Sequence, residues 1–240
     1  MISYIHSYFI NYLIKLKDEY IDKNMKDEAS YYTEKEEFVN YSTSLIGLSI
    51  SVVGFIFLII FSYNYGEMIH LLCCTAYGLS MVFMYVCSTF YHGSKSGKLK
   101  KFFRLMDHSS IFLYIAGSYT PFTLINLKGV WGWSIFSIVW FLAITGIILR
   151  IIFRTRAATI TMVLYILMGW TIIVAIKPLI DNLALNAIIL LFTGGISYTA
   201  GLIFYSWNSL PYHHAIWHIF VMIGSFTHFF AVLFYVIPIF

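Results

Sequence analysis

Seven long apolar runs dominate the chain and constrain its fold more than any other feature. Each is about the 20 residues that an α-helix needs to cross the hydrocarbon core of a bilayer. The runs cover Ser44–Tyr63, Met68–Tyr91, Ser109–Asn126, Gly132–Ile152, Ala158–Ile176, Leu183–Tyr205 and His214–Val236. None alternates as barrel strands do, and backbone groups in lipid must be satisfied within the segment. The sequence therefore predicts an all-α integral membrane protein, a bundle of seven transmembrane helices.

The composition agrees with lipid as the surrounding solvent. Hydrophobic residues make up 60% of the chain and charged residues only 11%, against roughly 25% charge in soluble globular domains. The formal net charge of +4 could suggest nucleic acid, but the basic residues lie in short clusters between apolar runs, where membrane topology explains them. We therefore expect the cell membrane as the location and membrane lipids, not nucleic acid, as partners.

Basic residues in the connectors between the runs predict the orientation of the bundle. The second and fourth connectors carry eight: Lys95, Lys98, Lys100, Lys101, Arg104, Arg150, Arg154 and Arg156. The third and fifth connectors carry only two, Lys128 and Lys177. Because positively charged connectors remain in the cytoplasm, the even connectors are expected there. With seven spans, the amino terminus is then cytoplasmic and the carboxyl terminus lies outside.

The first part of the chain differs in composition from the rest. Eight of the eleven acidic residues precede Asn40, and Ile2, Ile5 and Phe9 begin an apolar series at helical spacing. We expect residues 1–40 to form an amphipathic and polar cytoplasmic segment that can lie on the membrane surface. The short connectors leave no room for a second folded domain, so residues 41–240 are expected to form one membrane domain.

Histidines near the helix ends are the strongest candidates for chemistry. His214 and His218 are four residues apart and project from one helical face, so their imidazoles can share one metal ion. The predicted topology brings His92 and Asp107 to the same cytoplasmic depth, and Ser88 lies one turn before His92. Three nitrogen donors with one open position are typical of a catalytic Zn²⁺ site. No clearly aimed thiolate or thioether favours a softer metal.

Simpler explanations exist for the same residues. A single membrane histidine commonly hydrogen-bonds a neighbouring helix, and Asp107 is equally well suited to cap the helix that follows it. Neither His108 nor His213 is expected to ligate the same ion, because each points roughly 100° away from the neighbouring candidate. His228 lies about 15 Å deeper along the last helix and is also excluded as a ligand.

Several motifs recur along the chain in a specific order: Ser88-x-x-x-His92, Leu105-Met-Asp107-His108-Ser109, Ala116-Gly-Ser-Tyr-Thr-Pro-Phe122, Trp131-Gly-Trp133, Leu167-Met-Gly-Trp170 and Leu210-Pro-Tyr-His-His-Ala-Ile-Trp-His218. Together they closely resemble the hemolysin III family, which belongs with the progestin and adiponectin Q receptors. The resemblance covers about residues 34–236 and does not reach the first 33 residues.

The resemblance implies a seven-helix fold with a cytoplasmic amino terminus and a particular set of zinc ligands. These ligands are His92, His214 and His218. The resemblance further implies that Asp107 contacts the zinc through water and that Ser88 lies beside it. Many relatives carry a histidine after the threonine of the first helix, whereas this chain has Ser44 after Thr43. Any role of that histidine is therefore absent here or taken by another residue.

Three functions compete on these features. The first is a zinc-dependent membrane hydrolase, similar to the ceramidase-like activity of the wider superfamily, with Asp107 as general base and Ser88 steadying the water or oxyanion. Its substrate would be a lipid amide or ester whose acyl chain enters between helices. The second is a receptor or sensor braced by a structural zinc. The third, a cytolytic pore, is disfavoured because the chain is too apolar to have an evident soluble form before insertion.

Overall fold

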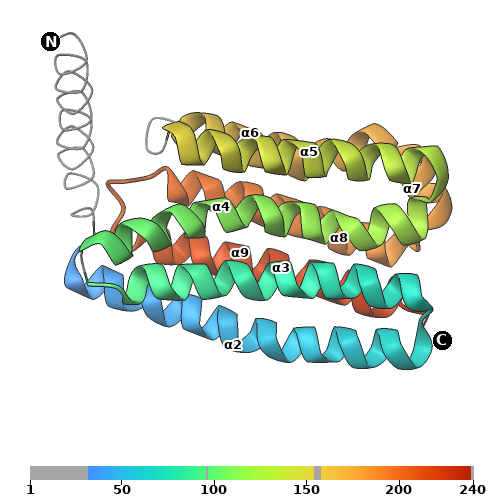
Figure 1. Ribbon diagram of the computed structural model, residues 1–240, viewed down its shortest axis with the longest axis horizontal. Coiled ribbons are helices and arrows are strands. Elements are labelled where there is room, and N and C mark those ends of the chain that lie inside the picture. Colours follow the sequence, from blue (N-terminus) through green and yellow to red (C-terminus); the bar gives the residue numbers. More distant parts are fainter. Residues whose placement is uncertain (1–31, 96, 154–157, 239–240) are drawn as a thin grey trace, which may run out of the picture.

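The computed structural model describes residues 32–95, 97–153 and 158–238, and every regular element within these ranges is helical (Figure 1). The elements are α2 (Glu34–Tyr65), α3 (Met68–Gly93), α4 (Gly97–Pro121), the π-helix η1 (Phe122–Leu127), α5 (Gly129–Phe153), α6 (Ala158–Trp170), the 3-10 helix η3 (Thr171–Ala175), α7 (Ile176–Asn182), α8 (Leu185–Tyr205) and α9 (His213–Tyr235). The predicted all-α class is confirmed.

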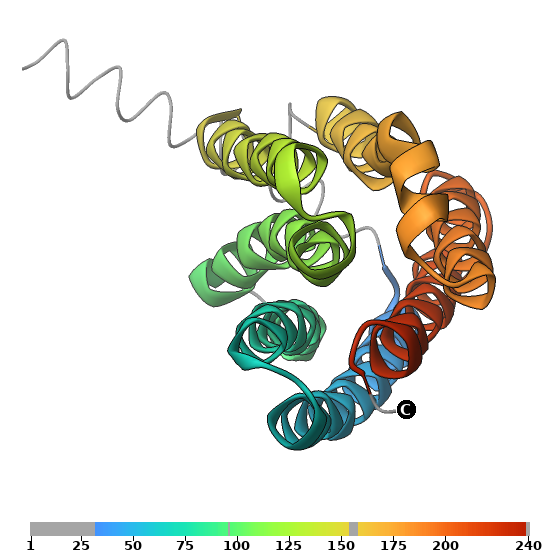
Figure 2. The same cartoon turned by 90° about the vertical axis from the view of Figure 1, so that its right-hand side faces the viewer.

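The long helices run side by side and form a ring when viewed along the bundle (Figure 2). Successive helices are neighbours, and α9 returns beside α2 to close the ring. The predicted surface segment lies largely outside the described residues, and its last residues, from Glu34 onward, form the first turns of α2. This order places residues from the two ends of the chain next to each other.

Within the described residues, six helices are long and apolar enough to cross a membrane: α2, α3, α5, the segment Thr159–Asn182, α8 and α9. The third predicted run, Ser109–Asn126, lies in α4 and η1 and is not among the six. Helix α4 opens with lysines and arginine and carries Asp107 in its interior, which makes it more polar than the others. The membrane class is confirmed, whereas the count of seven spans and the orientation of the termini stay predictions.

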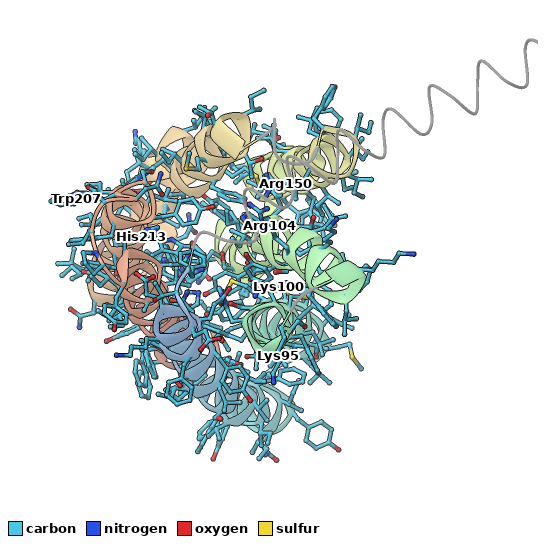
Figure 3. All side chains as sticks on the ribbon, turned by 90° about the vertical axis from the view of Figure 1, so that its left-hand side faces the viewer. Lys95, Lys100, Arg104, Arg150, Trp207 and His213 are labelled. Atoms are coloured by element: carbon cyan, nitrogen blue, oxygen red, sulfur yellow. The ribbon has the colours of Figure 1, made fainter. Side chains whose placement is uncertain are left out.

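Basic residues gather at one end of the bundle. Figure 3 looks onto this end, where Lys95, Lys100, Arg104 and Arg150 lie near His213. These residues come from the second and fourth predicted connectors, so the structure brings the two connectors together at one end. Arg154 and Arg156 of the fourth connector lie outside the described residues.

Helix α2 begins with a capping box and then buries a narrow face of small residues. The Thr33 hydroxyl accepts from the backbone N–H of Glu36, and the Glu36 carboxylate accepts from the backbone N–H of Thr33. The buried residues of the helix recur every three or four positions: Asn40, Ser44, Gly47, Ser51, Gly54, Leu58 and Ser62. Small side chains let membrane helices approach closely, and a Cβ on Gly47 would lie 2.3 Å from the Tyr85 ring of α3.

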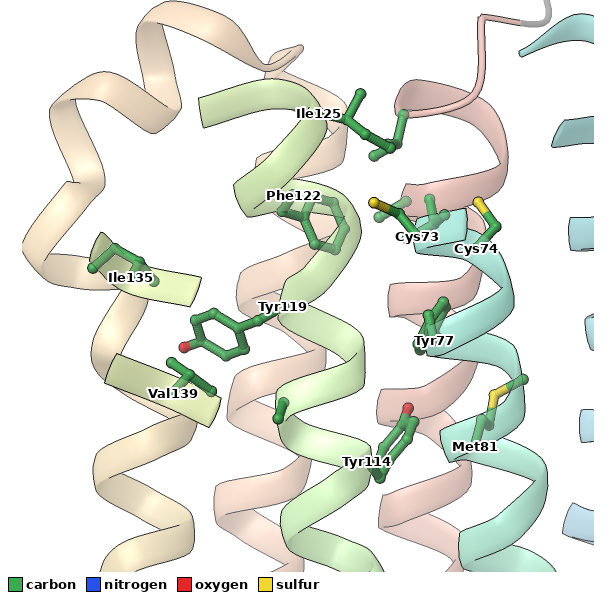
Figure 4. Packing of buried hydrophobic residues seen from close by; sticks show 14 of the residues in the cluster. Cys73, Cys74, Tyr77, Met81, Tyr114, Tyr119, Phe122, Ile125, Ile135 and Val139 are labelled. Atoms are coloured by element: carbon green, nitrogen blue, oxygen red, sulfur yellow. The ribbon is translucent and has the colours of Figure 1, made fainter. Parts of the chain in front are cut away.

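Buried apolar and aromatic side chains fill the middle of the bundle, as Figure 4 shows for α3 and α4. Tyr77 and Phe112 are fully buried there. The hydroxyl of Tyr114 lies 2.8 Å from that of Tyr198 and donates to Ser225 at 3.0 Å. These hydroxyls satisfy one another, which avoids the cost of leaving polar groups unpaired in lipid.

The contact between α5 and the end of the α4–η1 segment is tight enough to test. A Cβ on Gly132 would lie 2.2 Å from the Thr123 carbonyl oxygen, a rigid backbone atom. We expect Gly132→Ala to lower the free energy of unfolding by about 1–3 kcal/mol through overpacking. Thermal unfolding of the detergent-purified protein measures the effect.

Gly169→Ala is the matched control, because nothing lies within 4 Å of a Cβ built at Gly169 in α6. This variant should unfold at the parent temperature or slightly above it, since alanine favours a helix by about 0.5–1 kcal/mol. Equal unfolding temperatures for the two variants would contradict the close approach of α5.

Candidate metal centre

Three histidines from two helices meet at the end of the bundle where the basic residues gather. One ring nitrogen from each of His92, His214 and His218 lies within 4.8 Å of the other two. All three side chains are buried, and the Nε2 atoms of His92 and His214 are 3.1 Å apart. The structure therefore brings together all three histidines that the sequence analysis selected.

Helix α2 orients two of these rings from behind. The Nδ1–H of His92 donates to the Glu37 carboxylate at 2.7 Å, since a carboxylate only accepts. The Thr43 hydroxyl lies 2.8 Å from Nδ1 of His218 and 3.0 Å from the carbonyl oxygen of Val39. Both rings are therefore held through Nδ1, which leaves their Nε2 atoms for the cluster, as is usual for metal-binding histidines.

The cluster fits a bound cation. The Nε2 atom of His218 is buried and has no hydrogen-bond partner among the described residues, although buried polar atoms normally have one. A cation between the rings would take up the lone pairs of all three Nε2 atoms. Three buried imidazole rings are a donor set that suits a borderline metal ion.

Asp107 and Ser88 lie next to the histidines as a pair. The Ser88 side chain hydrogen-bonds the Asp107 carboxylate, which also interacts electrostatically with His92 and lies 3.7 Å from Nδ1 of His108. Among the described residues, the group whose ligand atoms converge closely enough to share a metal ion consists of His92, His214 and His218 and does not include Asp107. Asp107 therefore lies beside the three histidines without being one of the converging ligands.

The alternative that Asp107 caps a helix is wrong. Helix α4 begins at Gly97, and Asp107 lies in its interior. The helix starts earlier than the apolar run because its first turns are rich in lysine and extend beyond the apolar part of the bundle. A cap role requires one of the exposed N–H groups of a first turn, and these groups belong to residues near Gly97.

His108 and His228 have other hydrogen-bond partners and do not belong to the group of three histidines, as expected. His108 lies 2.8 Å from the carbonyl of Arg104 and 3.3 Å from the Tyr205 hydroxyl. Nε2 of His228 lies 3.2 Å from the carbonyl of Leu191. Neither belongs to the convergent group.

Sequence reasoning missed the residues of α2 that support the histidines. The sequence analysis places Glu37 only within the polar segment 1–40, yet its carboxylate accepts from His92 and from the Lys100 ammonium at 2.8 Å. Thr43 was noted only because Ser44 follows it where relatives have histidine. The available signal was the spacing of Glu37, Asn40 and Thr43, three polar residues on one face at the start of an apolar helix.

Tyr32 covers the histidines from the side of the amino-terminal segment. Its ring centroid lies 5.2 Å from that of His214, 5.7 Å from His213 and 6.3 Å from His92. Burial raises the pKa of the Tyr32 phenol well above its ordinary value, so the phenol stays neutral. Tyr32 therefore shields the cluster without adding a charged ligand.

Comparison with known proteins gives a consistent set of relatives. Residues 32–229 match the family described as "Haemolysin-III related". A protein named Hemolysin-3 from Bacillus cereus is 48% identical over 204 residues, which cover 85% of this chain and 93% of the relative. A Hemolysin-3 homolog from Bacillus subtilis (strain 168) is 44% identical over 208 residues, 87% of this chain and 98% of the relative. The monocyte to macrophage differentiation factor of Homo sapiens is 24% identical over 162 residues, 65% of this chain and 67% of the relative.

Because the Glu37 carboxylate holds the His92 ring by a hydrogen bond, we expect the loss of that carboxylate to lower the affinity for metal. Glu37→Gln keeps the size of the side chain but removes the charge that pairs with His92 and Lys100. We expect metal affinity to fall by about 10- to 100-fold, as for other partners of metal-binding histidines. Competition with a chromogenic chelator measures the affinity.

Glu34→Gln serves as the control, because Glu34 lies one turn earlier on the exposed side of α2. Its metal affinity should equal that of the parent. If Glu37→Gln binds metal as tightly as Glu34→Gln, then α2 does not support the cluster in the way described.

Proposed function

The chain belongs to the hemolysin III family, and from this premise we propose that it is a zinc-dependent membrane hydrolase that cleaves a lipid amide or ester. It is a multi-pass protein of the cell membrane. The observation that carries the proposal is the buried group of three histidines with an aspartate beside it. A buried acid and a cluster of metal-binding nitrogens at one point are costly in a membrane and are typical of functional sites.

His92, His214 and His218 would hold the zinc through their Nε2 atoms, and the fourth position would stay open for substrate. Bound zinc supplies a Lewis acid for the carbonyl group and lowers the pKa of water toward 7. Glu37 and Thr43 keep the rings of His92 and His218 in the required tautomer. The histidines are neutral ligands, so they leave the positive charge of the metal available to the substrate.

Asp107 is the proposed general base. Its carboxylate is buried beside His92, and the Ser88 hydroxyl donates to it and so restricts its orientation. In this position it can take a proton from the attacking water and return it to the leaving group. A positioned acid–base residue of this kind typically contributes about 10²- to 10⁴-fold to a rate.

An apolar cavity beside the centre supports a lipid substrate. A cavity of about 120 Å³ extends between α4, α6, α8 and α9 and is lined mainly by apolar and aromatic side chains. A smaller cavity of about 20 Å³ is lined by Asp107 and His214, and the two cavities share Tyr165, Leu202 and Trp217 in their walls. An acyl chain in the larger cavity would therefore place its polar end next to Asp107.

A receptor with a structural zinc is the second candidate. The contacts of Glu37 and Thr43 join α2 to the histidines of α3 and α9, so a bound metal would brace three helices. Metal sites of this kind contribute directly to stability. The two candidates differ in whether Asp107 is needed for turnover.

Metal content is the first quantity to measure. Elemental analysis of the detergent-purified protein should find close to one zinc per chain. The double variant His214→Ala/His218→Ala should lose it, because two of the three nitrogen donors are gone. A parent protein that carries no metal after purification without chelators would rule out the hydrolase.

The base is tested by Asp107→Asn, which keeps the shape of the side chain but cannot take the proton. We expect it to retain zinc and to lower kcat by about 100-fold or more on fluorescent acyl amides and esters in mixed micelles. Asp181→Asn is the control, because Asp181 is exposed near the end of α7, and it should be fully active.

Equal turnover by Asp107→Asn and the parent would eliminate the proposed base. Dye release from sealed vesicles, at the same rate for both proteins, would instead favour the cytolytic activity that the names of the bacterial relatives suggest.

A further inference from the structure

A second apolar cavity lies between α2, α3 and α9, and we call it the α2–α9 groove. Its volume is about 280 Å³, larger than the cavity of about 120 Å³ between α4, α6, α8 and α9. The described residues that line the two cavities are all different. The groove is lined by α2 from Gly47 to Phe57, by α9 from Met222 to Leu233, and by two residues of α3, Met81 and Tyr85. It is therefore separate from the space proposed for the substrate.

The groove has a buried floor and an exposed rim. Gly47, Ser51 and Gly54 recur on one face of α2 and form the floor together with Tyr85. Large apolar side chains that are exposed on the surface form the rim: Val53, Phe57, Phe226 and Phe230. Both α2 and α9 are long and apolar enough to cross the membrane. The groove therefore opens to the hydrocarbon of the bilayer.

The polar groups in the groove already have partners. The Ser51 hydroxyl donates to the carbonyl of Leu48 at 2.8 Å, and the Ser225 hydroxyl donates to the carbonyl of Val221 at 2.9 Å. The Tyr85 hydroxyl lies 3.3 Å from the oxygen of Ser225. Among the described residues, none of those that line the groove is charged. These features suit an occupant that consists of hydrocarbon, because no lining group is left to bind a headgroup or a peptide.

The length and depth of the groove match one leaflet of a bilayer. The α2 side runs from Gly47 to Phe57 and the α9 side from Met222 to Leu233, which is about 15 Å at 1.5 Å per residue. The hydrocarbon core of a bilayer is about 30 Å thick, so one leaflet contributes about half of that. Gly47 follows Thr43 by one helical turn, and Met222 follows His218 by one turn. The groove thus runs from just below the histidines toward the middle of the membrane.

The occupant must be narrow, because α2 and α9 touch each other along the groove. The Thr43 hydroxyl of α2 lies 2.8 Å from Nδ1 of His218 of α9. A Cβ on Gly54 would lie 3.3 Å from the ring of Phe229. A helix is about 10–12 Å wide with its side chains and cannot reach the floor between two helices in contact. An acyl chain is one methylene wide and can, and without it the lining atoms would lack van der Waals partners.

We propose that the α2–α9 groove binds the acyl chain of a membrane phospholipid, as a second lipid site separate from the substrate cavity. The bound chain fills the space between α2 and α9 and so stabilises the helix pair that holds Thr43 against His218. Neither a bound metal nor hydrolysis is needed for this site, so the proposal stands or falls independently of the proposed function.

Photo-cross-linking tests the site. The full chain is reconstituted in phosphatidylcholine vesicles that contain phosphatidylcholine with a diazirine in one acyl chain, and labelled peptides are identified by mass spectrometry. We expect stronger labelling of segments 47–57 and 222–233 than of the α5 face with Ile138, Phe141 and Ile144, which is also exposed but lines none of the cavities described.

Two serines of α2 provide a matched pair of variants. Ser51 lies in the floor of the groove, whereas Ser49 is exposed outside it, and each hydroxyl donates to a carbonyl of the preceding turn. Ser51→Phe places a ring in the groove and should reduce the labelling of both segments to the level of α5. Ser49→Phe adds the same ring elsewhere on the helix and should be labelled as the parent is.

Stability gives a second measurement. Phosphatidylcholine added to the delipidated parent should raise its unfolding temperature, and Ser51→Phe should gain less because its own ring fills the groove. Ser49→Phe should gain as much as the parent. If Ser51→Phe cannot be purified, Ile50→Trp narrows the groove from its rim and allows both measurements.

Three results would overturn the proposal. Labelling of the two segments only as strong as that of α5 would mean that this face contacts bulk lipid alone. Weaker labelling than α5, in a protein that elutes as a dimer, would assign the face to a second copy of the chain. Equal gains in unfolding temperature for Ser51→Phe and Ser49→Phe would show that lipid in the groove does not support the helix pair.

Discussion

The close approach of three imidazole rings inside a membrane bundle is the constraint on which the rest of the structure depends. Each ring must face its neighbours with a lone pair, so each needs an acceptor behind it to hold the proton on Nδ1. Glu37 and Thr43 supply partners for two of the rings, both from α2, whereas Nδ1 of His214 has no partner among the described residues. Helix α2 must therefore pack tightly against α3 and α9, which explains its buried face of small residues and the contact of Gly47 with Tyr85.

Helix α4 is less hydrophobic than the other long helices because it carries a residue of the centre. It carries Asp107 in its interior and lysines in its first turns, and it is the one predicted run that falls outside the six apolar spans among the described residues. A membrane helix favours apolar residues, whereas the centre needs a carboxylate in this helix, and such conflicts are common where a fold holds a reactive group. Burial between α3, α5 and α6 compensates, because neighbouring helices shield its polar face from lipid.

The two sides of the centre differ in a way that bears on access. Tyr32 covers the histidines from the side of the amino-terminal segment. On the other side, the small cavity at Asp107 shares lining residues with the larger apolar cavity between α4, α6, α8 and α9. The lipid substrate that we propose would approach through the apolar side, where burying its acyl chain is favourable, with its polar end directed to Asp107.

The sequence by itself determined the membrane class, the helices and the common depth of His92, Asp107, His214 and His218. Apolar run length, loop charge and the spacing of four residues are local properties, and each could be read without knowing how helices pack. Only the tertiary structure decided that Glu37 and Thr43 face the histidines and that Asp107 lies inside α4. The rotation of a helix about its axis and its register against a neighbour depend on side chains from several segments at once. No single segment of the sequence contains that information.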